Sequence, residues 1–223
     1  AHGRLALGES GEQLEALARG GEPLGPVVAH ARQRIEAHVE APAVVVAHRL
    51  PRLTNWLDYL IELGASGLAL GPVFASTSHG YDTFDYFRID PRLGDDADFD
   101  ALVAAAHDRG IKVMLDGVFN HVGRAFPQFQ QALTGPDDPA GRWFRLFWRE
   151  GGGEPDYEHF EGHRDLVTLN HDAPEVVDFV VEVMCHWLQR GADGWRLDAA
   201  YAIPAQFWAR VLPGVRERFP DAY

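Results

Sequence analysis

One pattern recurs along most of this chain and limits what the chain can fold into. A short apolar segment is followed by a loop, an amphipathic segment with helical spacing, a glycine and the next apolar segment. Helices that end at a glycine before a short strand are typical of α/β domains, in which each helix returns the chain so that successive strands run parallel. The sequence therefore predicts a parallel sheet that is covered by helices.

The repeats define four strands and four helices. The strands are predicted at residues 42–48, 66–71, 111–119 and 193–198, and the helices at 55–63, 99–109, 175–190 and about 204–219. The second strand is made of small and apolar residues, so we expect it to be buried. The third helix carries an apolar stripe that must pack on the sheet. Its members are Val176, Val180, Val183 and Trp187.

The predicted helix starts depend on capping residues. Thr54 and Asp98 each precede a helical segment, and their side chains can accept hydrogen bonds from the free backbone N–H groups of a first turn. Asp172 and Glu175 have capping-box spacing around Pro174, which is itself favoured in a first turn. We therefore expect Thr54, Asp98 and Asp172 to be helix caps.

One connection is much longer than the others. About fifty residues separate the strand ending near Phe119 from the helix starting near Pro174, and a loop of this length is usually a functional excursion or a small subdomain. We place this excursion at about residues 122–172. Its aromatic residues are expected to form its own core, with one of them a candidate for lining a substrate cleft. They are Trp143, Phe144, Phe147, Trp148, Tyr157 and Phe160.

Residues 1–42 differ from the rest of the chain. They are rich in Ala, Gly, Glu and Arg and contain two helix candidates, but no residues with a recognisable chemical pattern. We treat them as an N-terminal helical segment of unknown role and residues 43–223 as the α/β domain. No glycine-rich phosphate-binding pattern follows any of the predicted strands, which disfavours a nucleotide-binding sheet.

The composition excludes several classes of partner. The formal net charge is −13, and basic residues are scattered singly, whereas nucleic acids and anionic membranes select basic patches. A single cysteine, Cys185, excludes an internal disulfide and a multi-cysteine metal site. No segment approaches the roughly 18 apolar residues of a membrane span, and the start lacks a secretory signal pattern. We expect a cytoplasmic protein, with secretion left open because the chain starts without methionine and a leader could have been removed.

Charged residues stand at the ends of two predicted strands. Side chains alternate along a strand, so Arg196 and Asp198 share a face, and Asp116 can meet Arg196 from a neighbouring strand. A structural ion-pair network would satisfy this pattern, because one guanidinium can pair with two carboxylates. Catalysis would satisfy it too, because an arginine beside Asp198 favours the ionised carboxylate that a nucleophile needs. Parallel α/β folds also place their active sites at these strand ends.

Several segments together resemble the alpha-amylase family, glycoside hydrolase family 13. The resemblance extends over about residues 50–223, with its motifs in the family's order and spacing. The segments are "GLALGPVF" (67–74), "HGYDTFDY" (79–86), "DGVFNH" (116–121), "LVTLN" (166–170) and "GWRLDA" (194–199).

The resemblance implies an α/β fold of the (β/α)8 TIM-barrel type and a retaining glycosidase mechanism. About the first four βα units would be present, and the excursion after the third strand would correspond to domain B. Asp198 is implied to be the nucleophile that forms a covalent glycosyl-aspartate intermediate. Arg196 would hold Asp198 ionised, and Asp116 would orient Arg196. The substrate would be an alpha-glucan or alpha-glucoside, used in hydrolysis or transglycosylation.

Four further roles are implied by the resemblance. His121 would hydrogen-bond the sugar in the cleavage subsite, Tyr81 would stack on that sugar, and His79 would lie near it. Asn120 matches a position that binds calcium in many members, although a single neutral oxygen ligand makes a weak site. Thr168 stands where the family often has an acid. No cofactor is implied as required, and calcium is the one metal to consider.

A retaining glycosidase also needs a general acid, which in this family follows the fifth strand. No residue of this chain matches it, so we expect a partial chain with little or no turnover, whose sheet is closed by self-association or by a C-terminal half. One alternative is a catalytically silent half-barrel that binds carbohydrate or self-associates. Another is a doubly wound hydrolase or phosphotransfer fold, which a non-sequential strand order would support.

Overall fold

The computed structural model describes residues 46–223. At its centre is a parallel sheet of β1 (Gly67–Ala69), β4 (Lys112–Gly117) and β9 (Gly194–Leu197), in that order. The backbone of Tyr223 extends the sheet beyond β9, because it forms hydrogen bonds with the backbone of Asp193 and Trp195. The parallel arrangement was predicted correctly. The sequential order favours a barrel over a doubly wound sheet, in which the order reverses at a switch point.

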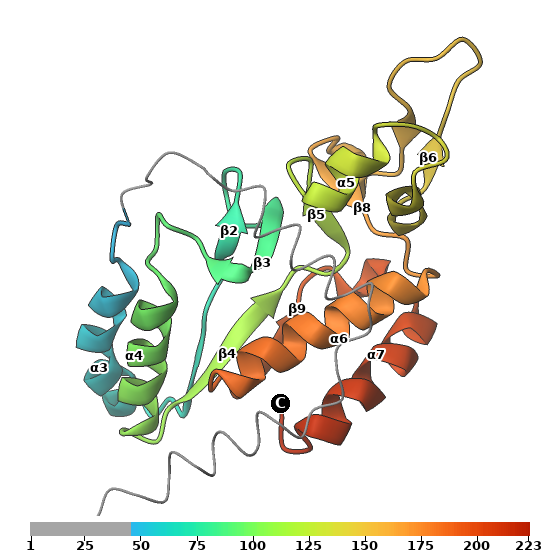
Figure 1. The fold of residues 1–223 in the computed structure, drawn as a ribbon. Helices are drawn as coiled ribbons and strands as arrows, with labels where there is room; N and C mark the ends of the chain where they lie inside the picture. Colours follow the sequence, from blue (N-terminus) through green and yellow to red (C-terminus); the bar gives the residue numbers. More distant parts are fainter. Residues whose placement is uncertain (1–45) are drawn as a thin grey trace, which may run out of the picture.

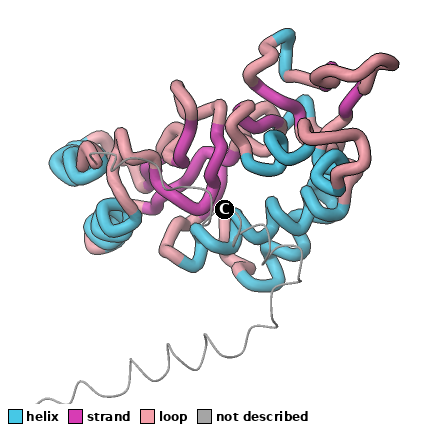
Figure 2. The backbone as a smooth tube through the Cα atoms, turned by 45° about the horizontal axis from the view of Figure 1, so that its top comes forward, coloured by secondary structure: helices cyan, strands magenta, loops and turns pink. Residues whose placement is uncertain are grey.

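Four helical segments cover this sheet, as predicted. They are η1 (Leu50–Trp56) continued by α3 (Leu57–Glu62), α4 (Asp96–His107), α6 (Pro174–Gln189) and α7 (Ala205–Arg218). Figures 1 and 2 show the strands between two helix pairs, α3 with α4 and α6 with α7. The predicted stripe of α6 is fully buried, with Val176, Val180, Val183 and Trp187 all inaccessible.

The first helix begins earlier than predicted. It starts as the 3-10 helix η1 with Pro51 in its first turn, where the fixed φ of proline favours a helical start. Thr54 therefore lies inside the helix, and its hydroxyl donates to the Pro51 carbonyl over 2.6 Å. The predicted cap at Thr54 is wrong.

The other two predicted caps are also wrong. Asp95 caps α4, and Asp98 is its partner in a capping box: Asp98 N–H donates to Asp95 Oδ1 over 2.9 Å, and Asp98 Oδ2 accepts from Asp95 N–H over 3.2 Å. At α6 the N-cap is Ala173, without a side-chain hydrogen bond. Asp172 and Glu175 instead form ion pairs with arginines of the excursion, which take up their carboxylates.

Strand β1 was expected to be buried, but it is largely exposed. Gly67 and Ala69 are exposed and Leu68 is half-buried, because β1 is the edge strand of the described sheet. The strand predicted at 42–48 does not form in residues 46–48, the part of it that the structure describes. Residues 42–45 and the two helix candidates within 1–42 lie outside the described residues.

The long connection after β4 folds into its own small structures. Strands β5 (His121–Gly123) and β8 (Leu166–Thr168) pair antiparallel, and β6 (Leu146–Phe147) pairs with β7 (Asp156–Tyr157). Helix α5 (Pro127–Ala132) and the 3-10 turns η2 (Pro139–Trp143) and η3 (Phe160–Gly162) complete it. In Figure 1 this part projects beyond the helices.

Half of the aromatic residues predicted to form the excursion's core do so. Trp143, Phe144 and Tyr157 are buried, whereas Phe147 is 55% exposed. Trp148 and Phe160 are half-buried. The excursion is small, so its short hairpin β6–β7 has too little neighbouring structure to cover both faces.

The chain between β1 and α4 forms another hairpin, which packs against the core. It consists of β2 (Phe74–Ser76) and β3 (Thr83–Ile89). Tyr86 of β3 is buried, and its hydroxyl donates to the Val118 carbonyl over 2.5 Å. Trp187 Nε1 of α6 donates to the Tyr86 carbonyl over 2.7 Å. Through these two hydrogen bonds the buried Tyr86 joins the hairpin to the end of β4 and to α6.

Replacing Trp187 should therefore test the core. Trp187→Ala removes a large buried ring and leaves the Tyr86 carbonyl without its donor, so the free energy of unfolding should fall by about 3–5 kcal/mol. Urea denaturation followed by circular dichroism measures this. Trp56→Ala is the control, because Trp56 is 61% exposed and its loss should cost at most about 0.5 kcal/mol. Equal losses for the two variants would contradict the assigned core.

Candidate active site

One arginine joins two carboxylates at the carboxyl ends of β4 and β9. The strand register places Asp116 directly beside Arg196. Arg196 Nη1 donates to both oxygens of Asp116 over 2.7 Å and forms an ion pair with Asp198 Oδ1 at 2.9 Å. The Asp198 N–H donates to the Gly117 carbonyl over 3.0 Å, which continues the β4–β9 ladder up to the candidate nucleophile. The predicted sharing of one guanidinium by two carboxylates is thus present.

The two ends of this ion pair differ in their surroundings. Asp116 is only 2% exposed, whereas the Arg196 side chain is 51% exposed on the face opposite the helices. Burial raises the pKa of Asp116 and the nearby Asp198 carboxylate adds to this, while Arg196 opposes both. The hydrogen bond to Asp116 in turn raises the pKa of Arg196, which stays charged. The buried Asp116 carboxylate therefore fixes the orientation of the exposed Arg196 guanidinium.

The backbone turns sharply just after Asp198. Ala199 adopts the left-handed conformation, with φ 46° and ψ 30°, and η4 (Ala200–Ala202) follows at once. A left-handed alanine is strained by roughly 1–2 kcal/mol, and strain of this kind clusters at functional sites. The turn leaves Asp198 as the last residue aligned with the sheet.

His121 begins the excursion and is almost completely buried. The Asn120 amide nitrogen donates to its Nδ1 over 3.1 Å, so the neutral ring carries its proton on Nε2. Burial lowers the pKa of His121 to about 4, against the opposing effects of the Asp198 carboxylate and the Tyr81 carbonyl. Among the described residues, Nε2 has no hydrogen-bond partner. His121 is thus a neutral ring whose Nε2 is buried in this structure.

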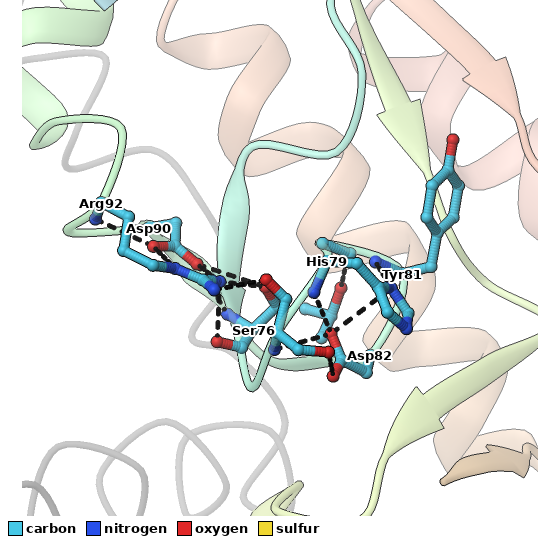
Figure 3. A network of polar contacts seen from close by, with 9 residues as sticks. Ser76, His79, Tyr81, Asp82, Asp90 and Arg92 are labelled. Atoms are coloured by element: carbon cyan, nitrogen blue, oxygen red, sulfur yellow. Dashed lines mark hydrogen bonds and ion pairs between the residues drawn. The ribbon is translucent and has the colours of Figure 1, made fainter. Parts of the chain in front are cut away.

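His79 and Tyr81 lie on the loop between β2 and β3 (Figure 3). The Tyr81 N–H donates to His79 Nδ1 over 3.2 Å, and their ring centroids are 6.1 Å apart. The loop packs closely on β5, because a side chain at Gly123 would overlap the Asp82 carbonyl oxygen. This packing brings the His79–Tyr81 loop and His121 together.

A comparison with known families identifies the chain. Residues 50–222 match the family model for the alpha-amylase catalytic domain. The chain belongs to the alpha-amylase family. The family's catalytic domain is a (β/α)8 barrel, so the sheet and helices described above are part of such a barrel, as predicted.

Several members of the alpha-amylase family are similar in sequence. Intracellular maltogenic amylase from Bacillus subtilis is 38% identical over 78% of this chain and 30% of its own length. Cyclomaltodextrinase from Geobacillus thermopakistaniensis is 40% identical over 78% of this chain and 30% of its own length. The chain thus spans about 30% of the length of these curated relatives.

Solved structures of the alpha-amylase family agree with the fold. Cyclic alpha-maltosyl-(1→6)-maltose hydrolase from Arthrobacter globiformis has a TM-score of 0.72 at 35% identity, covering 78% of this chain and 40% of that chain. A debranching enzyme from Nostoc punctiforme has a TM-score of 0.71 at 40% identity, covering 77% and 38%. At 35% and 40% sequence identity, both structures support membership of the family as well as the shared fold.

Two residues of the excursion contact the site: Phe160, a member of the aromatic set that held a candidate for lining the cleft, and Glu161, which was not predicted. The Phe160 ring stacks on His121 with centroids 4.7 Å apart and planes at 20°. Glu161 Oε1 accepts from the hydroxyl of Tyr201 over 2.7 Å, which joins η3 to the loop after Asp198. Tyr201 could have been found from its place in "GWRLDAAY". Glu161 could not, because forty positions separate it from Tyr201 and no local pattern marks it.

The alpha-amylase family's calcium position fits this chain poorly. Calcium takes oxygen ligands, and Asn120 is buried and offers only one neutral amide oxygen. Thr168, opposite His121 in the β5–β8 register, supplies no charge. Within residues 46–223, the one group of acids and histidines spaced for a metal is His48, Asp95 and Asp98, and these two acids form the α4 capping box. We therefore draw no mechanistic step through calcium at Asn120.

The other sequence predictions near the site concern local structure. Asp82 and Asp85 make hydrogen bonds within their own hairpin, as expected. Cys185 is buried on α6. No helix in the part of the chain that the structure describes is long and apolar enough to cross a membrane.

The low pKa of His121 predicts a pH-dependent stability. An unfolded histidine binds a proton near pH 6.5 but the folded one only near pH 4, so protonation favours the unfolded state as the pH falls between these values. The free energy of unfolding should drop by up to about 3 kcal/mol over this range from His121 alone. His171, whose pKa burial also lowers, adds in the same direction.

His121→Gln should make this pH dependence shallower when urea denaturation is repeated from pH 7 to pH 4. His79→Gln is the control, because it replaces an exposed histidine on the same side of the sheet. An unchanged slope in His121→Gln would show that the buried ring is not held neutral.

Proposed function

We propose that this chain is part of a retaining alpha-glycosidase or transglycosidase that acts on alpha-glucans or alpha-glucosides, with Asp198 as the nucleophile. The observation that carries the proposal is the Arg196 guanidinium, which holds Asp198 at 2.9 Å at the end of β9. The relatives support this proposal, because they include a maltogenic amylase, a cyclomaltodextrinase and a neopullulanase.

Each residue of the site has a role in this proposal. An Asp198 oxygen attacks the anomeric carbon, the bond to the leaving group breaks, and a glycosyl ester forms through an oxocarbenium-like transition state. Arg196 positions the attacking carboxylate, and Asp116 positions Arg196. His121 donates its buried Nε2 proton to a sugar oxygen once the groups that cover it, among them the stacked Phe160 ring, move aside. Tyr81 stacks on the sugar ring, and His79 borders it. Residues 122–172 act as domain B.

The general acid is not assigned to any of residues 46–223. Asp116 is the carboxylate nearest to the Arg196–Asp198 pair, but it is buried and both of its oxygens accept from Arg196. A substrate whose leaving group needs no protonation is therefore the right probe for Asp198. In α-maltosyl fluoride, fluoride leaves as the carbon–fluorine bond breaks and Asp198 forms the new ester.

The proposal predicts that α-maltosyl fluoride labels Asp198. Intact-mass spectrometry of the chain should show one added maltosyl group, and peptide mapping should place it on the peptide that contains Asp198. Asp198→Asn should abolish the label, because a neutral amide is a poor nucleophile. Asp137→Asn, which changes an exposed acid of the excursion, is the matched control and should label normally. A label that survives Asp198→Asn would overturn the assignment.

Tyr81 should act on binding more than on chemistry in the same reaction. Tyr81→Ala removes the ring, so the α-maltosyl fluoride concentration for half-maximal labelling should rise about tenfold. Tyr81→Phe keeps the ring and should stay within about twofold of the parent chain. If Tyr81→Phe is as impaired as Tyr81→Ala, the hydroxyl rather than the ring face is what contacts the sugar.

A silent half-barrel that binds carbohydrate or self-associates is the second candidate. The observation in its favour is an exposed apolar stripe on the first helix, made by Trp56, Tyr59 and Leu63. Maltose binding without any Asp198 ester, together with concentration-dependent association in sedimentation experiments, would favour this candidate over the enzyme.

A further inference from the structure

The loop that carries His79 and Tyr81 is closed by Asp82. Asp82 Oδ1 accepts from the N–H groups of Ser78 and His79 over 3.2 Å each, and Oδ2 accepts from the Ser78 hydroxyl over 2.7 Å. Figure 3 shows these bonds inside the turn, with the Tyr81 ring pointing away from them. Asp82 therefore sets the shape of the loop, but its bonds to Ser78 and His79 do not attach the loop to the rest of the fold.

Besides the packing of Asp82 on β5, a polar attachment comes from Arg92, which lies fourteen residues beyond Ser78. Arg92 Nη1 donates to the Ser78 carbonyl. Nη2 donates to the Ser76 carbonyl over 3.0 Å and to the Ser76 hydroxyl over 2.7 Å. One guanidinium thus holds both the end of β2 at Ser76, as Figure 3 shows, and Ser78, the residue next to His79.

Asp90 holds this guanidinium in place. Asp90 follows β3 and is buried, and its Oδ1 accepts from Arg92 Nε over 2.8 Å and from Arg92 N–H over 2.9 Å. Its Oδ2 accepts from the Ser76 N–H over 3.1 Å. Burial works to raise the pKa of Asp90, but the hydrogen bonds from Arg92 and Ser76 together lower it. The pair is therefore ionised and its fork geometry is fixed.

We propose that Arg92 is a positioning residue for the sugar-binding loop. Through Asp90, Ser76 and Ser78 it sets where His79 and Tyr81 stand relative to His121. This inference rests on the function proposed above for Tyr81 and His121. It adds a residue outside the motifs that identified the site, and Arg92 itself touches none of the reacting groups.

The contacts favour a positioning role over a contribution to the core. The Arg92 side chain is half-exposed, so its removal opens little apolar surface. What it leaves behind is the buried Asp90 carboxylate without its guanidinium, and a loop held by its internal bonds and by its packing on β5. The cost should therefore appear as movement of residues 77–82, because Asp82 keeps the turn closed while its polar attachment is lost.

Two measurements on the full chain test this inference. In labelling by α-maltosyl fluoride, Arg92→Ala should raise the half-maximal concentration about tenfold and change the maximal rate less than about threefold, because a misplaced binding loop weakens positioning. In hydrogen–deuterium exchange, which needs no activity, amides of residues 77–82 should exchange at least about tenfold faster.

Arg92→Lys and Arg109→Ala serve as comparisons. Arg92→Lys keeps the charge beside Asp90 but cannot reach Ser76 and Ser78 together, so it should restore thermal stability more fully than labelling affinity. It also serves if Arg92→Ala fails to fold. Arg109→Ala removes another half-exposed arginine, paired with Asp58 over 2.7 Å, and should leave both measurements unchanged.

The outcomes separate this inference from the proposed function. If the parent chain is labelled at Asp198 but Arg92→Ala and Arg92→Lys show the parent's half-maximal concentration and exchange, the inference is overturned and the function stands. If the parent chain is not labelled, the function fails, and the exchange of residues 77–82 still decides whether Arg92 holds the loop.

Discussion

The site depends on one guanidinium held between two carboxylates at the ends of neighbouring strands. Taking the Asp116 carboxylate out of water is costly unless it is well paired, and here Arg196 Nη1 meets both Asp116 oxygens and one of Asp198. The register of β4 and β9 provides that geometry, because it sets Asp116 beside Arg196. The helices that keep these strands in register therefore also keep the candidate nucleophile in place.

A second requirement is that segments distant in the chain reach the same strand ends. The β2–β3 loop reaches His121 because it packs on β5, and the excursion reaches it through the stacked ring of Phe160. Glu161 adjoins that ring and bonds to Tyr201, three residues beyond Asp198. The short turn η3 therefore contacts both His121 and the loop after β9, so the excursion is coupled to the candidate catalytic strand by two contacts of different chemistry.

The sequence was sufficient to predict the parts of this arrangement that local periodicity encodes. The parallel order of the strands, the buried stripe of α6 and the meeting of Asp116 with Arg196 follow from alternation and helical spacing. The caps at Thr54 and Asp98 were wrong because Pro51 and Asp95 start these helices earlier. The cap at Asp172 was wrong because its carboxylate pairs with Arg145, which leaves Ala173 at the N-cap before Pro174. Three features were missed: the stacking of Phe160 on His121, and the contacts made by Glu161 and by Arg92. Their partners are set by tertiary packing, which no short pattern reports.

The distribution of arginines, which argued against a nucleic-acid partner, has a structural reason in the described part of the chain. Several of the scattered arginines each hold one connection by pairing with acids or carbonyl oxygens. Arg196 joins two strands, Arg92 joins a loop to its hairpin, Arg145 joins the excursion to the start of α6 through Asp172, and Arg190 joins α6 to α4 through Asp96 and Asp100. An acidic chain with few cations gains most from an arginine where it bridges segments, because its planar fork fixes direction as well as charge. The same property that makes Arg196 suitable for orienting Asp198 thus recurs where the structure must hold its own long connections.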